Sequence, residues 1–150
     1  MTTELVTPYF FLYDVFMKDC VRHQDIAMEV KTWERGQITG KLYQLATGLP
    51  VVIDEATGVV WGEVMSFHHP ERIVSMIDRQ EGYDEGNIKG SHLLREVRPV
   101  TLSSTGAQLS AYVYLFPKEK FDVDALHAVW AHGGDWRKFV MMPRFDGYQH

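Results

Sequence analysis

Apolar residues along the chain recur mainly with the spacing of β-strands. The aromatic run from Tyr9 to Phe16 follows Pro8 and predicts a buried strand. The twenty residues after it follow no clear period. Thr57 and Gly58 are typical of a turn that closes a hairpin, and residues 103–106 indicate a second hairpin turn. Further strands are therefore expected at 37–46, 51–53, 59–67, 93–102 and 108–116.

Two segments have helical features. Residues 69–80 are expected to form a helix, because Pro70 suits the first helical position and Gly82 suits the end. A second helix is predicted at 122–131, and the charged, glycine-containing stretch 83–90 is expected to be a loop. The apolar residues of the first helix fall on one stripe: Ile73, Val74 and Ile77.

The order of these elements favours an α+β fold. Strands outnumber helices, and most neighbouring strands are joined by short turns. A doubly wound parallel sheet needs a helix after nearly every strand, so it is disfavoured. We expect a small mixed or antiparallel β-barrel with two or three surrounding helices. The length of 150 residues suits a single domain that spans 1–150.

Composition narrows the class of protein. A hydrophobic fraction of 45% with 23% charged residues is typical of a folded soluble chain. The formal net charge of -5 argues against a nucleic-acid binder, which needs a basic surface. No apolar run approaches the roughly 20 residues of a membrane helix, and no basic region follows Met1 as in a secretory signal. Cys20 alone cannot form an internal disulfide, so a cytoplasmic location is expected.

The common signatures of nucleotide, metal and serine-hydrolase sites are absent. His68 and His69 are adjacent and point apart on any regular element, whereas His127 and His132 are five residues apart. Neither spacing suits one metal ion, so no metal or other cofactor is expected. Neither residue directly next to Cys20 is basic, which disfavours a role as nucleophile.

One acidic residue has a notable position. Glu81 lies at the C-terminal end of the 69–80 helix, where the partial negative charge of the helix disfavours a carboxylate and should raise its pKa. An adjoining apolar cavity would raise the pKa further. Such a group suits general acid or base catalysis near neutral pH. Position alone leaves open the simpler interpretation that Glu81 is solvated.

Short motifs then occur in a definite order between residues 9 and 137. The segment 58–67 leads into a helix that closes with Asp78, Glu81 and Gly82. Four other motifs occur. They are Gly40 with Leu42 and Tyr43; Arg95 followed by residues 99–102; residues 111–114; and residues 134–137. Together they resemble the gamma-glutamyl cyclotransferase superfamily, in particular its gamma-glutamylamine cyclotransferase-like bacterial branch.

The resemblance implies a small mixed β-barrel and an intramolecular acyl transfer. The α-amino group of a γ-glutamyl compound attacks its own γ-carbonyl, 5-oxoproline forms, and an amine leaves. Glu81 matches the position of the general acid/base. The implied partner is thus a small γ-glutamyl molecule, with neither nucleic acid nor membrane involved.

The resemblance also implies a substrate-binding loop of Tyr13, Asp14, Val15, Phe16 and Met17. Its backbone N–H groups would hold a substrate oxygen. Asp14 replaces the family's glycine, and Val15 replaces a small hydroxyl residue. Two interpretations follow: the substrate is altered and Asp14 pairs with a cationic group, or the chemistry is lost and the domain binds a ligand or protein partner.

A third possibility is a structural or interaction protein outside this family. The segment Met141–His150 contains the aromatic residues Phe145 and Tyr148, which suit a partner contact. A solvated Glu81 without an adjoining cavity would favour this class.

Overall fold

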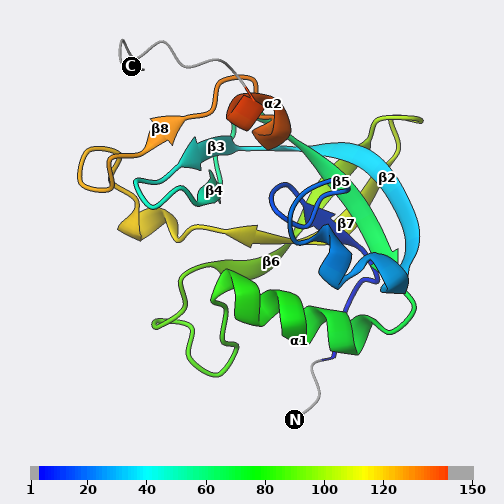
Figure 1. Cartoon of the computed structure of the whole chain (residues 1–150). Coiled ribbons are helices and arrows are strands. Elements are labelled where there is room, and N and C mark those ends of the chain that lie inside the picture. Colours follow the sequence, from blue (N-terminus) through cyan, green and yellow to red (C-terminus); the bar gives the residue numbers. More distant parts are fainter. Residues whose placement is uncertain (1–3, 142–150) are drawn as a thin grey trace.

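Five strands close into a barrel in the computed structural model, which describes residues 4–141 (Figure 1). Around the barrel the order is β1-β5-β2-β6-β7. Only the contact between β1 and β7 is parallel. The expected small mixed barrel in an α+β fold is confirmed. The strands are β1 (Phe10–Leu12), β2 (Val30–Thr39), β5 (Val59–Phe67), β6 (Leu94–Leu102) and β7 (Gln108–Leu115).

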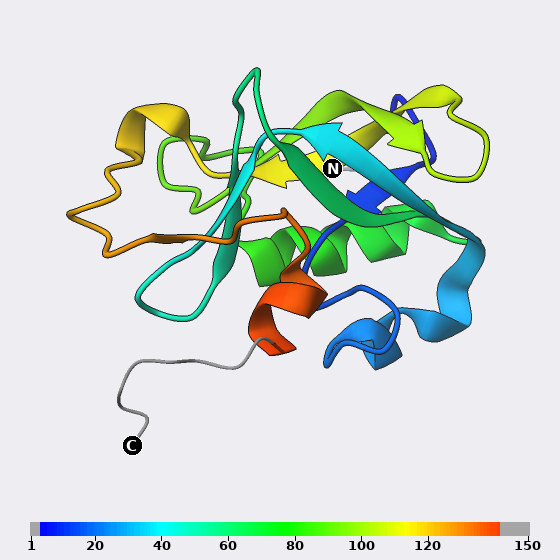
Figure 2. The same cartoon turned by 90° about the horizontal axis from the view of Figure 1, so that it is seen from above.

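A second sheet of three strands projects from one side of the barrel (Figure 2). It consists of β3 (Lys41–Gln44), β4 (Pro50–Ile53) and β8 (Val129–Trp130), in the order β4-β3-β8. The predicted strand 37–46 is therefore two strands, which separate at Gly40. The expected hairpin across Thr57 and Gly58 is also wrong, because β4 pairs with β3 and β5 pairs with β1 and β2.

Two glycines explain this change of sheet. The N–H of Gly40 donates to the carbonyl oxygen of Gly58 at 3.2 Å, where the two chain segments cross. A Cβ atom on Gly58 would lie 2.5 Å from the Gly40 carbonyl oxygen, which is too close for any other residue. At this crossing the chain leaves the barrel after β2 to form β3 in the second sheet, and it returns to the barrel after β4 to form β5.

Helix α1 (Pro70–Glu81) lies along one side of the barrel, and the short helix α2 (Trp136–Met141) lies near the second sheet (Figure 1). Single 3₁₀ turns occur at His23–Asp25, Ala27–Glu29 and Lys118–Lys120. The predicted helix at 69–80 is confirmed to within one residue at each end. Its stripe of Ile73, Val74 and Ile77 is buried.

Two other predicted elements are wrong. The strand expected from Tyr9 to Phe16 stops at Leu12, because the chain turns and the N–H of Met17 bonds to the Asp14 carbonyl oxygen at 3.1 Å. The helix expected at 122–131 is replaced by a turn followed by β8, which pairs with β3. The Asp122 carboxylate accepts the N–H groups of the second and third residues after it and so stabilises the turn.

Two apolar clusters hold these elements together. One fills the barrel and includes Phe11, Val64 and Val113, all buried. The other lies between the barrel and α1 and joins the helix stripe to Phe10 and Tyr114. The position of α1 is thus set by the outer side chains of β1, β5 and β7.

Within residues 4–141, no helix is both long and apolar enough to cross a membrane. The candidate partner contact with Phe145 and Tyr148 lies outside the described residues.

An ion pair with a buried carboxylate ties α2 to the barrel. Glu63 on β5 is 2% exposed, and its carboxylate accepts Arg137 Nη2 at 2.9 Å and the N–H of Lys18 at 2.6 Å. Arg137 also donates to the carbonyl oxygen of Lys18. The guanidinium therefore joins α2, the turn after β1 and the barrel wall.

We expect Arg137→Ala to lower the free energy of unfolding by about 2–3 kcal/mol, because it leaves the buried Glu63 carboxylate without its cation. Urea unfolding measures this loss. The matched control is Lys138→Ala, which removes the exposed neighbouring cation and should change stability by less than about 0.5 kcal/mol. Equal losses in the two variants would contradict the prediction.

Candidate active site

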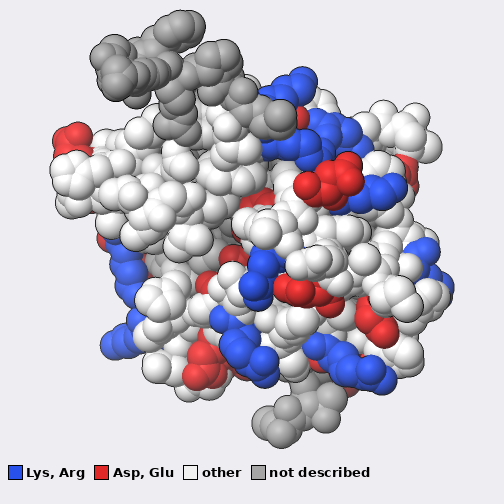
Figure 3. All heavy atoms as spheres, in the orientation of Figure 1, with Lys and Arg blue, Asp and Glu red and all other residues white. Residues whose placement is uncertain are grey.

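A cavity of about 500 Å³ opens at the C-terminal end of α1. In Figure 3 this face is hollowed below β3 and β4, next to the left-hand end of α1. The wall is largely apolar, and three basic side chains are also present. The lining residues that matter for the chemistry are Leu45, Phe116, Arg79, Glu81, His92 and Lys120.

Glu81 is the last residue of α1, and the end of the helix is sharply defined. Gly82 adopts a left-handed conformation with φ of 73°, and the N–H of Tyr83 bonds back to the Asp78 carbonyl oxygen at 2.8 Å. A Cβ atom at Gly82 would lie 2.7 Å from the His92 ring. The helix therefore stops beside the cavity, with Glu81 as one of its lining residues.

A polar network anchors this last helical turn to the barrel. The Asp78 carboxylate accepts hydrogen bonds from Arg95 on β6 and from the Tyr114 hydroxyl on β7. The Arg95 side chain is only 5% exposed, and its guanidinium lies about 5 Å from the rings of Tyr83 and Tyr112. Burial raises the pKa of Asp78 although both partners favour its charged form. Asp78 thus fixes the turn that carries Glu81.

The carboxyl groups of Glu81 and Asp14 are hydrogen-bonded to each other. Burial, followed by the neighbouring charge of Asp14, raises the pKa of Glu81 to about 10. Burial also raises the pKa of Asp14, which is 4% exposed. Two carboxylates in contact within a poorly solvated site cannot both be ionised near neutral pH, so the pair retains one proton.

The loop predicted to bind substrate lies directly beside Glu81, but its side chains point in different directions. Tyr13 is 2% exposed and donates to the Tyr114 carbonyl oxygen at 2.7 Å. Phe16 and Met17 are buried in the two apolar clusters, and Val15 is partly buried against the outer one. Of the five predicted residues, Asp14 alone brings a carboxyl group to Glu81.

Sequence reasoning missed most of the cavity wall. Leu45 comes from the turn between β3 and β4, Phe116 follows β7, and Lys120 belongs to a 3₁₀ turn. These residues share no motif with Glu81, so only the folded chain brings them together. Arg95 and Asp78 did carry a signal, because both belong to the motifs quoted above.

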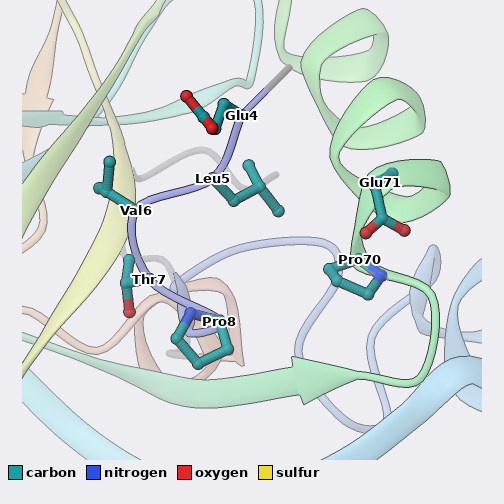
Figure 4. A pocket seen from close by; sticks show the side chains of 7 residues that line it. All are labelled: Glu4, Leu5, Val6, Thr7, Pro8, Pro70 and Glu71. Atoms are coloured by element: carbon teal, nitrogen blue, oxygen red, sulfur yellow. The ribbon is translucent and has the colours of Figure 1, made fainter. Parts of the chain in front are cut away.

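Residues 4–141 contain no group of three or more His, Cys, Asp or Glu side chains arranged to hold a metal ion. Another hollow, of about 770 Å³, lies where residues 4–8 run past the first turn of α1 (Figure 4). It is lined by Pro70 and Glu71, at the opposite end of α1 from Glu81. The carboxyl pair therefore singles out the smaller cavity as the candidate site.

Residues 10–138 match the sequence profile of the family described as gamma-glutamyl cyclotransferase, AIG2-like. The chain belongs to this family. The match spans Asp14, Glu81 and the anchoring network of Asp78. No curated protein matches the sequence.

Solved structures of this fold support the architecture. YkqA from Bacillus subtilis superimposes with a TM-score of 0.63 at 20% identity, over 89% of this chain. That alignment spans 41% of YkqA, so the chain corresponds to about two fifths of that protein. An AIG2-like protein from Mus musculus gives a TM-score of 0.63 at 12% identity, over 86% of this chain and 87% of its own. These identities show the fold alone.

The proton held by the carboxyl pair predicts how stability depends on pH. The unfolded chain releases this proton above the ordinary carboxyl pKa of about 4, whereas the folded chain keeps it to much higher pH. Unfolding in that range therefore releases a proton, and the pair lowers stability by up to about 1.4 kcal/mol per pH unit as pH rises. We expect Glu81→Gln to be more stable than the wild type by about 1–3 kcal/mol at pH 8.

Urea unfolding of the wild type and Glu81→Gln at pH 5, 6.5 and 8 measures this effect. The advantage of the variant should grow with pH. Glu71→Gln makes the same change at an exposed position at the other end of α1, and its difference from the wild type should stay constant. Parallel curves for the wild type and Glu81→Gln would contradict the prediction.

Proposed function

We propose that this protein catalyses γ-glutamyl cyclotransferase-type acyl transfer, in which a γ-glutamyl compound cyclises to 5-oxoproline and releases an amine. The α-amino nitrogen attacks the γ-carbonyl carbon of the same molecule, a five-membered lactam forms, and the bond to the leaving nitrogen breaks. Over a full cycle, two protons leave the α-ammonium group and two reach the departing amine. Glu81 is the general acid/base for these transfers.

The observation that carries this proposal is the position of Glu81 at the wall of the cavity. Its raised pKa suits a group that takes a proton from one nitrogen and returns a proton to another. The anchored last turn of α1 keeps the carboxyl group in place. Because nucleophile and electrophile belong to one molecule, the enzyme has mainly to hold the folded substrate against this fixed acid/base.

The shape and lining of the cavity also support a small substrate. A volume of about 500 Å³ suits a γ-glutamyl compound, whose folding into a ring would be guided by the apolar wall. We assign the loop of Tyr13, Asp14, Val15, Phe16 and Met17 to the substrate-binding region beside Glu81. The side chains of Phe16 and Met17 belong to the core, and the N–H groups of residues 14–16 face the Asp14 carboxyl group in the resting site. A single cysteine supports a reducing, cytoplasmic setting.

Release of 5-oxoproline from a panel of γ-glutamyl compounds tests the proposal. The panel contains γ-glutamyl amino acids, γ-glutamyl amines and γ-glutamyl-lysine isopeptide, so that the best substrate identifies the leaving amine. We expect wild-type turnover, and a fall in kcat of about 10²–10⁴-fold for Glu81→Gln, because the amide neither accepts nor returns the proton.

Glu71→Gln is the matched control and should retain wild-type turnover. Folded wild-type protein that releases no 5-oxoproline from any compound would overturn the proposal. Equal activity of the wild type and Glu81→Gln would keep the reaction but remove Glu81 from its assigned role.

A further inference from the structure

The loop after β1 directs three backbone N–H groups at one side chain. Burial raises the pKa of the Asp14 carboxyl group, whereas the Glu81 carboxyl group and the nearby N–H groups of residues 14, 15 and 16 lower it. The Asp14 carbonyl oxygen accepts the N–H of Met17 at 3.1 Å, which closes the loop. Asp14 is 4% exposed. Backbone donors stabilise the charged form of a carboxyl group, so the loop favours an ionised Asp14.

The proton of the pair therefore resides mainly on Glu81. No comparable set of backbone N–H groups stabilises a charge on Glu81, whose pKa is raised by burial and then by Asp14. The resting arrangement is a protonated Glu81 that donates to an ionised Asp14. Of the two acids, Glu81 lines the cavity, whereas Asp14 is buried and is not part of the cavity wall.

We infer that Asp14 is a positioning residue for Glu81: in the resting site it accepts a hydrogen bond from protonated Glu81, and during turnover it stores that proton while Glu81 takes a second proton from the substrate. This inference rests on the function proposed above. It gives a role to a side chain that replaces the family's glycine.

The proton transfers balance. Glu81 first passes its proton to Asp14, and the freed Glu81 oxygen takes a proton from the α-ammonium group. The amino nitrogen then attacks the γ-carbonyl carbon. Glu81 gives its proton to the leaving nitrogen as the carbon–nitrogen bond breaks, and Asp14 returns the stored proton to Glu81. The remaining proton of the attacking nitrogen reaches the released amine through solvent, and the pair ends with one proton.

Other titratable groups face the pair and must be separated from it in any experiment. Burial raises the pKa of Tyr13, and the nearby carboxyl groups of Asp14 and Glu81 raise it further. Cys20 is influenced by the charge of Asp14. Arg79, His92 and Lys120 line the cavity on the side of Glu81. A titration that follows carboxyl carbons directly distinguishes the pair from all five.

We therefore expect the pKa of Glu81 to fall by about 1–3 pH units in Asp14→Asn, because a neighbouring negative charge is removed. NMR titration of protein with ¹³C-labelled glutamate and aspartate carboxyl groups measures this change without substrate. Asp19→Asn makes the same substitution at an exposed position of the same loop and should leave Glu81 unchanged. If Asp14→Asn does not fold, Glu81→Leu should raise the pKa of Asp14 instead, because it removes the hydrogen bond that protonated Glu81 donates to the Asp14 carboxylate. An unchanged carboxyl titration in the folded variant overturns the inference.

The pH dependence of kcat for 5-oxoproline release tests the catalytic part. The wild type should show two ionisations, one on each side of the optimum, and Asp14→Asn should show a single one with kcat reduced about 10–100-fold. Asp19→Asn should retain the wild-type profile. If Asp14 instead blocks the site, Asp14→Gly would turn over γ-glutamyl amino acids faster than the wild type, and this result overturns the inference.

The two proposals fail in different ways. A wild type that is silent on the whole panel overturns the proposed function. An active wild type whose pH profile is unchanged in Asp14→Asn overturns only the role assigned to Asp14.

Discussion

The contact between the Asp14 and Glu81 carboxyl groups is the constraint on which the candidate site depends. Three effects oppose a charge on Glu81: burial and the neighbouring Asp14 carboxylate, which raise its pKa, and the partial negative charge at the end of α1. One shared proton relieves all three. A resting protonated acid beside a cavity is therefore a consequence of where the fold places two side chains, and it needs no metal ion or unusual residue.

Keeping these two groups together requires a rigid frame, because each would be more stable apart in water. The frame is provided from both sides. Arg95 and Tyr114 hold Asp78, and with it the last turn of α1, while Gly82 ends the helix beside His92. On the other side, buried neighbours fix the loop that carries Asp14. The barrel thus acts as a common support for a helix end and a loop that are distant in the sequence.

The accuracy of the sequence predictions follows the range of the interactions concerned. Helix α1 was predicted to within one residue because its Pro70 and Gly82 signals are local. The helix expected at 122–131 failed because pairing of β8 with β3 outweighs local propensity. The family motifs placed Glu81 and the loop of Asp14, 67 residues earlier in the chain, in one site, but no pattern in the sequence shows that the two carboxyl groups touch. The cavity wall is equally non-local.

The energetic cost of the pair is itself an argument about function. A glutamine at position 81 would keep the helix end and the packing without the penalty of a partly buried acid next to a second carboxyl group, so stability alone does not favour Glu81 there. Asp78, one helical turn earlier, is different, because Arg95 and Tyr114 give its carboxylate partners that repay its burial. Asp78 and Glu81 thus differ in role. Asp78 joins α1 to the barrel, whereas Glu81 lowers the stability of the fold but places a titratable carboxyl group at a cavity, where it is available for acid–base chemistry.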